Sequence, residues 1–164
     1  MDHVTEHCSS DGLGGIDRVI LVHGFGAGPH DHWFPWLARS IRHVEVPRLP
    51  HPESPDASTW ASTIAERIGT SPDGLTGLAI VTHSLGGLTA LRAIERVIAC
   101  DSPANGDGRH LAAFIAVAPF AQQLPPTGEA ELDHFLATGL EGFLDGASPG
   151  ELRPLLGRTT VIHS

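Results

Sequence analysis

The sequence predicts an α/β protein in which a parallel sheet is covered by helices on both faces. Short, nearly all-apolar runs alternate along the chain with stretches whose apolar residues recur at helical spacing. The strands of a parallel sheet are buried on both faces, so unbroken apolar runs favour a parallel arrangement over an antiparallel one. The chain has 164 residues, of which 41% are apolar, and this is the size and composition of one globular domain.

The first strand and helix come at the start of the domain. RVILV, residues 18–22, is a β-branched run that ends at the glycine loop HGFG, residues 23–26, as a buried strand does. DHWFPWLARSIR, residues 31–42, has the pattern of a helix, and Asp31 is a suitable N-cap. HVEVP, residues 43–47, is predicted to be a second, short strand that proline ends.

A second helix, a third strand and a long helix follow. Asp56 can cap a helix over residues 57–68. The apolar run LAIVTH, residues 78–83, is the predicted third strand. Beyond Leu85, helical spacing is shown by four apolar residues: Leu88, Leu91, Ile94 and Ile98.

The last third of the chain predicts two more strands with short helices between them. LAAFIAVAP, residues 111–119, is the fourth strand, and RTTVIHS, residues 158–164, is the fifth. Short helical pieces are expected within residues 131–144 and 149–156. Right-handed crossovers bring the carboxyl ends of all these strands to one edge of the sheet, where the ligand sites of such folds lie.

Ser84 is placed at that edge, in the stretch VTHSLGG of residues 81–87. A strand, a serine and a helix joined through small residues predict a nucleophile elbow, in which a tight turn presents the hydroxyl above the sheet. Gly86 provides the small residue required two positions after the serine. Thr82, two positions before it, departs from the G-x-S-x-G pattern, and we interpret it as a tolerated variant. The alternative interpretation is that Ser84 only caps the following helix.

The HGFG loop supplies the second half of the predicted site. A backbone N–H from Phe25, beside the N–H of Leu85, would form an oxyanion hole. An ordinary glycine turn is the alternative interpretation of this loop. The other residues of the two motifs are expected around the substrate pocket, although histidines in such positions commonly orient loops: His23, Gly24, Gly26 and His83.

Three stretches of the chain resemble α/β-hydrolases of the family of retinoblastoma-binding protein nine and bacterial YdeN. They are VILVHGFGAGPHDHWFPWLARSI, VPRLPHPESPDASTWAS and IVTHSLGGLTALRAIE. The resemblance covers almost all of residues 18–164. It implies a three-layer, Rossmann-like α/β-hydrolase domain over residues 17–164. It also implies an esterase-like serine hydrolase of small acyl esters or amides, with Ser84 as the nucleophile. Residues 1–16 are polar and are predicted to be a flexible leader.

The same resemblance raises a difficulty about the catalytic acid and base. In this fold the triad follows the order Ser, Asp, His. The family's acid comes just after the strand that residues 159–164 resemble, and its histidine comes later, so both are expected beyond Ser164. We therefore expect the last strand or strands of the sheet to be absent and the catalytic activity to be impaired. We also expect that the exposed edge of the sheet can allow the protein to self-associate. His163 as the base, with Asp133 or Glu131 as the acid, is the weaker alternative.

Composition excludes several other classes of function. The formal charge is −9 and every basic residue is arginine, so the chain lacks the basic footprint of proteins that bind nucleic acid or anionic membranes. Cys8 and Cys100 are far apart and are interpreted as free thiols of a cytoplasmic protein. We expect no cofactor and no metal. Two alternatives to the hydrolase stay open: a non-catalytic binding protein with this fold, and a metal hydrolase based on His30-Asp31-His32.

Overall fold

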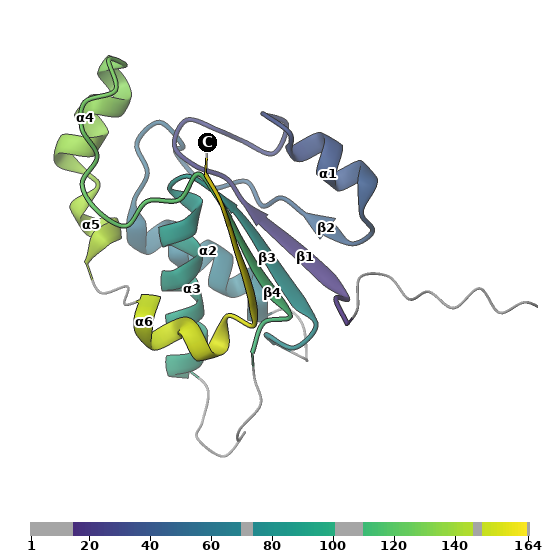
Figure 1. The fold of residues 1–164 in the computed structure, drawn as a ribbon. Helices are drawn as coiled ribbons and strands as arrows, with labels where there is room; N and C mark the ends of the chain where they lie inside the picture. The colour runs from purple at the N-terminus through teal and green to yellow at the C-terminus, as the bar shows by residue number, and fades with distance from the viewer. Residues whose placement is uncertain (1–14, 70–73, 101–109, 146–148, 164) are drawn as a thin grey trace, which may run out of the picture.

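The computed structural model describes residues 15–69, 74–100, 110–145 and 149–163 (Figure 1). The predicted leader, residues 1–16, lies almost entirely outside the described residues, as do Cys8 and Ser164. The strands are β1 Arg18–Val22, β2 Val44–Glu45, β3 Leu78–His83, β4 Ala113–Val117 and β5 Arg158–Ile162. The helices are α1 Phe34–Ser40, α2 Ala57–Gly69, α3 Gly86–Cys100, α4 Ala130–Thr138, α5 Glu141–Leu144 and α6 Pro149–Leu152, followed by the 3₁₀ turn η2 Arg153–Leu155.

The five strands form one sheet in the order β2-β1-β3-β4-β5, and every neighbouring pair is parallel. Helices α2, α3 and α6 lie against one face, and α1 lies against the other (Figure 1). Alternate residues of each central strand enter two separate apolar clusters, so Ile20 packs under α2 and α3 while Leu21 packs under α1. The predicted fold class is therefore confirmed. The edge strand β5 is exposed along its whole length.

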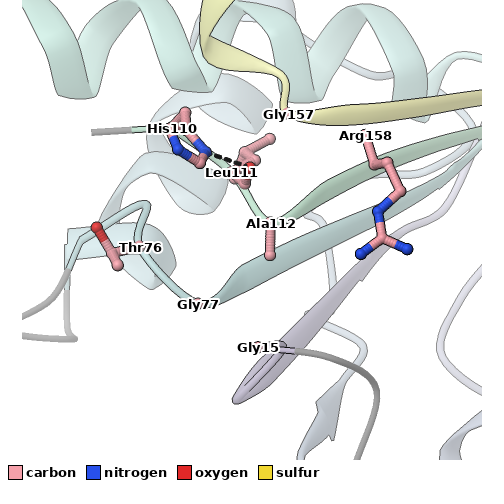
Figure 2. Close-up of a pocket in the computed structure, with 8 residues that line it drawn as sticks. All are labelled: Gly15, Thr76, Gly77, His110, Leu111, Ala112, Gly157 and Arg158. Carbon is pink, nitrogen blue, oxygen red and sulfur yellow. Dashed lines mark hydrogen bonds between the residues drawn. The ribbon is translucent and has the colours of Figure 1, made fainter. Parts of the chain in front are cut away.

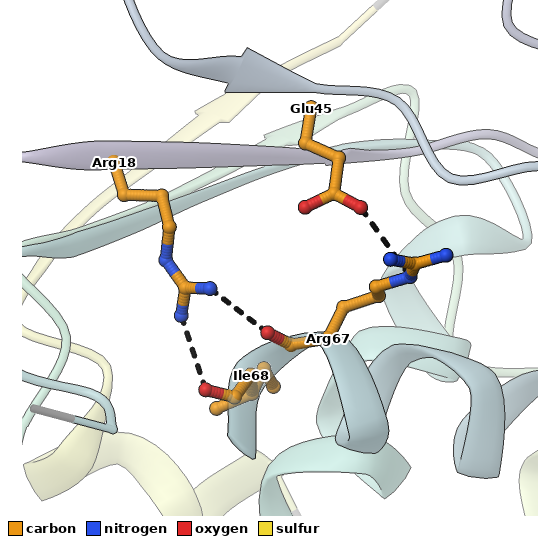
Figure 3. A network of polar contacts seen from close by, with 4 residues as sticks. All are labelled: Arg18, Glu45, Arg67 and Ile68. Carbon is orange, nitrogen blue, oxygen red and sulfur yellow. Dashed lines mark hydrogen bonds and ion pairs between the residues drawn. The ribbon is translucent and has the colours of Figure 1, made fainter. Parts of the chain in front are cut away.

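Two polar groups hold the ends of α2. At its start the Asp56 carboxylate accepts the N–H of Thr59 at 2.7 Å, which confirms the predicted cap. At its end the guanidinium of Arg18 on β1 donates to the carbonyls of Arg67 and Ile68 at 2.8 and 3.1 Å (Figure 3). A cation here satisfies the last carbonyls and opposes the negative end of the helix dipole. These contacts fix α2 against β1, the strand that carries the HGFG loop.

Two local predictions were wrong. Helix α1 begins at Phe34 instead of at Asp31, because the Asp31 carboxylate accepts the N–H of Gly28 at 2.7 Å and closes a turn before the helix. Strand β2 is confined to residues 44 and 45. Trp36, on α1, is 62% exposed. None of the helices in the described ranges combines the length and apolar character that crossing a bilayer requires.

Candidate active site

Ser84 occupies the turn between β3 and α3 with a backbone conformation that few L-residues adopt. Its φ is +52°, in the left-handed region. The turn is held on both sides, because the Ser84 N–H donates to the carbonyl of Val117 on β4 at 3.0 Å and its own carbonyl accepts the N–H of Gly87 at 3.0 Å. A non-glycine residue held in this region stores local strain, and such strain is concentrated at functional sites.

The glycines after Ser84 let the turn pack against the end of β1. A Cβ on Gly86 would overlap the carbonyl oxygen of Val22 and would lie 2.8 Å from that of His23, so only glycine fits. A Cβ on Gly87 would lie 3.6 Å from the hydroxyl of Thr82. Thr82 is fully buried, and its hydroxyl has no hydrogen-bond partner among the described residues. Threonine is thus packed inside the fold two positions before the serine, at ordinary contact distance from where a Gly87 Cβ would lie.

The HGFG loop lies directly against this turn. A Cβ on Gly24 would be 3.0 Å from the Cβ of Ser84 and 3.5 Å from the backbone nitrogen of Leu85. The loop is anchored by the N–H of Gly26, which donates to the carbonyl of Pro52 at 2.8 Å. Within the part of the chain that the structure describes, the N–H groups of Phe25 and Leu85 donate to no protein acceptor.

His23 lies beneath the loop and not on its surface. Its side chain is fully buried, its Nδ1 is 3.0 Å from the carbonyl oxygen of Gly24, and its Nε2 accepts the N–H of Leu49 at 3.2 Å. These partners fix a neutral tautomer in which Nδ1 donates. Burial lowers the pKa of His23 from its usual 6.5, against the opposing effect of the Gly24 carbonyl. The placement favours a positioning role, and direct contact of His23 with substrate stays a prediction.

His83 points to the opposite face of the sheet, toward the turn before α1. Its ring centroid is 4.9 Å from that of His32 and 5.9 Å from that of Phe34. Burial, followed by the nearby His32, lowers the pKa of His83 from 6.5. Its Nδ1 is buried and has no hydrogen-bond partner among the described residues. His83 thus packs against the α1 side of the sheet, and its predicted place in the substrate pocket stays a prediction.

None of the candidate bases and acids in the described ranges contacts the Ser84 hydroxyl through a hydrogen bond. His163 follows β5, which is two strands from β3, or roughly 10 Å at the usual strand spacing. The Asp133 carboxylate accepts the N–H groups of Thr127 and Gly128, and these bonds lower its pKa. Glu131 is exposed on α4. The structure therefore does not bring the alternative base and acid together with Ser84.

The side chains considered for a metal site contact different partners and do not converge on one point. His32 packs its ring against Phe34 and His83, and the Asp31 carboxylate is engaged by the Gly28 N–H. Across the described residues, no group of three or more histidine, cysteine or acidic side chains is arranged to hold a metal ion. The metal-hydrolase alternative gains no support from this arrangement.

A cavity of about 420 Å³ lies at the opposite edge of the sheet, where β3, β4 and β5 begin (Figure 2). Its polar side chains do not converge, because His110 and Arg158 lie to either side of Ala112 (Figure 2). The Nδ1 of His110 is within hydrogen-bonding distance, 2.9 Å, of the adjacent Leu111 carbonyl. Because Ser84 follows the carboxyl end of β3, this cavity is separate from the candidate active site.

The chain is similar to proteins of known family and known structure. The serine hydrolase family matches residues 19–141. The YdeN protein of Bacillus subtilis, which is named as a hydrolase, is 28% identical over 112 residues, or 66% of this chain and 53% of YdeN. The chain thus spans about half the length of that relative. The crystal structure of the B. subtilis ydeN product superimposes with a TM-score of 0.56 at 21% identity, covering 90% of this chain and 85% of that one. The crystal structure of a YdeN-like hydrolase from Pectobacterium atrosepticum gives a TM-score of 0.46 at 20% identity. The superposition covers 62% of this chain and 48% of that one.

Proposed function

Because the chain belongs to the serine hydrolase family, we propose that it hydrolyses small acyl esters or amides with Ser84 as the nucleophile. The observation that carries this proposal is the left-handed φ of Ser84 at the carboxyl end of β3. Such a turn lifts the hydroxyl out of the sheet, where an acyl group can reach it. The close approach of Gly24 to Ser84 and the free N–H groups of Phe25 and Leu85 support the same proposal.

The proposed reaction proceeds through an acyl-enzyme. The Ser84 oxygen attacks the carbonyl carbon, the π electrons move to the carbonyl oxygen, and the N–H groups of Phe25 and Leu85 stabilise the resulting oxyanion. Collapse of this intermediate expels the alcohol or amine, which takes up the proton that serine lost. Water then attacks the acyl carbon, the bond between that carbon and the Ser84 oxygen breaks, the carboxylic acid leaves, and a proton from water restores the Ser84 hydroxyl. Each proton transfer requires a base within hydrogen-bond reach of Ser84.

We further propose that residues 1–164 on their own react slowly. In the described ranges the Ser84 hydroxyl has no histidine or carboxylate as a hydrogen-bond partner. A hydroxyl without a base is a poor nucleophile, and an oxyanion hole with substrate binding alone retains roughly 10³ to 10⁴ of rate enhancement over water. The oxyanion donors would therefore support weak acyl transfer at Ser84, well below the rate of a complete triad.

Fluorophosphonate labelling of the purified chain, followed by intact mass, tests both proposals. We expect one adduct that forms over hours and is absent from Ser84→Ala. Ser54→Ala is the matched control, because Ser54 is an exposed loop serine, and it should label like the parent chain. An adduct that persists in Ser84→Ala, or a folded chain that never labels, would contradict Ser84 as the nucleophile. Complete labelling within seconds would contradict slow reaction.

A non-catalytic binding protein is the second candidate, and the unpartnered Ser84 hydroxyl is the observation that favours it. In that case the carboxyl edge of the sheet would hold an acyl compound without cleaving it. The two candidates differ in the fate of a p-nitrophenyl ester. A binding protein shifts the resonances of residues around Ser84 and releases no nitrophenol above the Ser84→Ala background, whereas a hydrolase releases nitrophenol above that background.

A further inference from the structure

We propose that Phe135, on α4, is a positioning residue for the backbone N–H of Phe25. This inference rests on the proposed function, in which that N–H is an oxyanion donor. The rings of Phe25 and Phe135 are stacked, with centroids 5.0 Å apart and an interplanar angle of 28°. The two residues are far apart in the chain, and no local sequence pattern links them.

The stack is one step in an unbroken series of ring contacts that returns to the same loop. Phe135 contacts Phe143 on α5 at 5.9 Å, and Phe143 contacts Trp60 on α2 at 5.8 Å. Trp60 in turn contacts His23 at 5.5 Å. Phe143, Trp60 and His23 are fully buried, and Phe135 is 6% exposed. The contacts therefore form a closed loop of packed side chains that begins at His23 and ends at Phe25, the two residues that flank Gly24.

This closed loop of contacts affects the direction in which the Phe25 N–H points. The Gly24 carbonyl and the Phe25 N–H belong to one planar trans peptide, so they point in opposite directions. The Nδ1–H of His23 holds the carbonyl at 3.0 Å. The stacked ring of Phe135 holds the other side of the same peptide through the Phe25 side chain. With both sides held by buried rings, the peptide plane is fixed and the N–H has a defined direction.

Phe135 also carries much of the attachment of α4. Only Phe135 and Leu136 are buried on this helix, which stands beyond the carboxyl ends of the strands (Figure 1). Gly139 lies against the same ring, and a Cβ there would be 2.7 Å from two carbons of the Phe135 ring. The backbone of Gly139 has φ −115° and ψ −20°, a negative-φ conformation that does not require glycine. Gly139→Ala therefore displaces the ring without removing it.

A displaced ring should affect the chemical step more than the binding of the reagent. An oxyanion donor acts on charge that develops during reaction, so its loss lowers the rate constant and leaves ground-state affinity nearly unchanged. Removal of one such donor typically costs 10²- to 10³-fold in rate. Because the variants tilt the donor and do not delete it, we expect roughly tenfold.

The test compares Phe135→Leu and Gly139→Ala with Phe114→Leu. Phe114 is 5% exposed in the same apolar core and lies on β4, so it controls for the loss of a buried aromatic ring. Hydrogen–deuterium exchange of a peptide spanning residues 23–27 reports on the loop whether or not the chain reacts. The concentration dependence of fluorophosphonate labelling separates the limiting rate from the half-saturating concentration.

We expect both variants near Phe135 to accelerate exchange in residues 23–27 and to lower the limiting labelling rate about tenfold at an unchanged half-saturating concentration. The Phe114→Leu chain should match the parent in both measurements. Parent-like exchange in the two variants, or equal acceleration in Phe114→Leu, would overturn the inference. Failure of the parent chain to label would count against Ser84 as the nucleophile, and the exchange data would still decide the role of Phe135.

Discussion

Replacing Ser84 by glycine should stabilise the protein while removing its nucleophile. Ser84 has φ +52°, and its hydroxyl has no hydrogen-bond partner in the described ranges. The side chain therefore contributes strain and gains no bond that offsets it. Ser84→Ala is the reference variant, because alanine also lacks the hydroxyl but retains the Cβ that makes the left-handed conformation unfavourable.

The size of the effect follows from two opposing terms. The left-handed conformation costs an L-residue about 1 to 2 kcal/mol, and glycine does not incur this cost. Glycine has more freedom in the unfolded chain, which opposes folding by about 0.5 to 1 kcal/mol. We therefore expect Ser84→Gly to be more stable than Ser84→Ala by up to about 1.5 kcal/mol, with a central value of about 0.75 kcal/mol. For a chain of this size, 1 kcal/mol corresponds to a shift of about 2 to 4 °C in Tm.

Urea unfolding followed by circular dichroism measures the difference. The midpoint should be higher for Ser84→Gly than for Ser84→Ala at an equal m-value, and neither variant should react with fluorophosphonate. Ser54 provides the control, since it is exposed and its φ is not positive. There glycine should be no more stable than alanine. A Ser84→Gly midpoint below that of Ser84→Ala would refute strain at the turn.

Three other predictions concern stability and association. Gly86→Ala should lower the free energy of unfolding by roughly 1 to 3 kcal/mol, the usual cost of overpacking, because the new Cβ meets backbone carbonyls at the end of β1. In urea unfolding the control Gly142→Ala, whose Cβ would make ordinary contacts, should be nearly neutral. Burial lowers the pKa values of His23 and His83 in the folded state, so the unfolded chain takes up protons first and stability should fall as the pH drops below about 6.5, the usual histidine value. A constant urea midpoint between pH 7 and 5 would contradict this. The exposed edge strand β5 should promote concentration-dependent association, which Val161→Lys should weaken in sedimentation velocity experiments.

Much of the fold and part of the site could be predicted from local patterns. Apolar runs located the three central strands β1, β3 and β4, since burial on both faces of a parallel sheet leaves a direct record in composition. The turn around Ser84 was recognisable because small residues and a preceding strand are local requirements. The start of α1 was misplaced because the Asp31 carboxylate accepts the N–H of Gly28, which precedes it in the chain, and so closes a turn instead of capping the helix.

The sequence by itself determined the α/β class, the order of the strands along the chain and the position of Ser84, because each depends on residues that are neighbours in the chain. Only the tertiary structure decided which partners those residues have. In the folded chain Gly86 packs against the end of β1, and His23 lies beneath the loop. Phe135 of α4 stacks against Phe25. These contacts join segments that folding alone brings together. Their geometry depends on how the packed layers fit, and no local pattern records that fit.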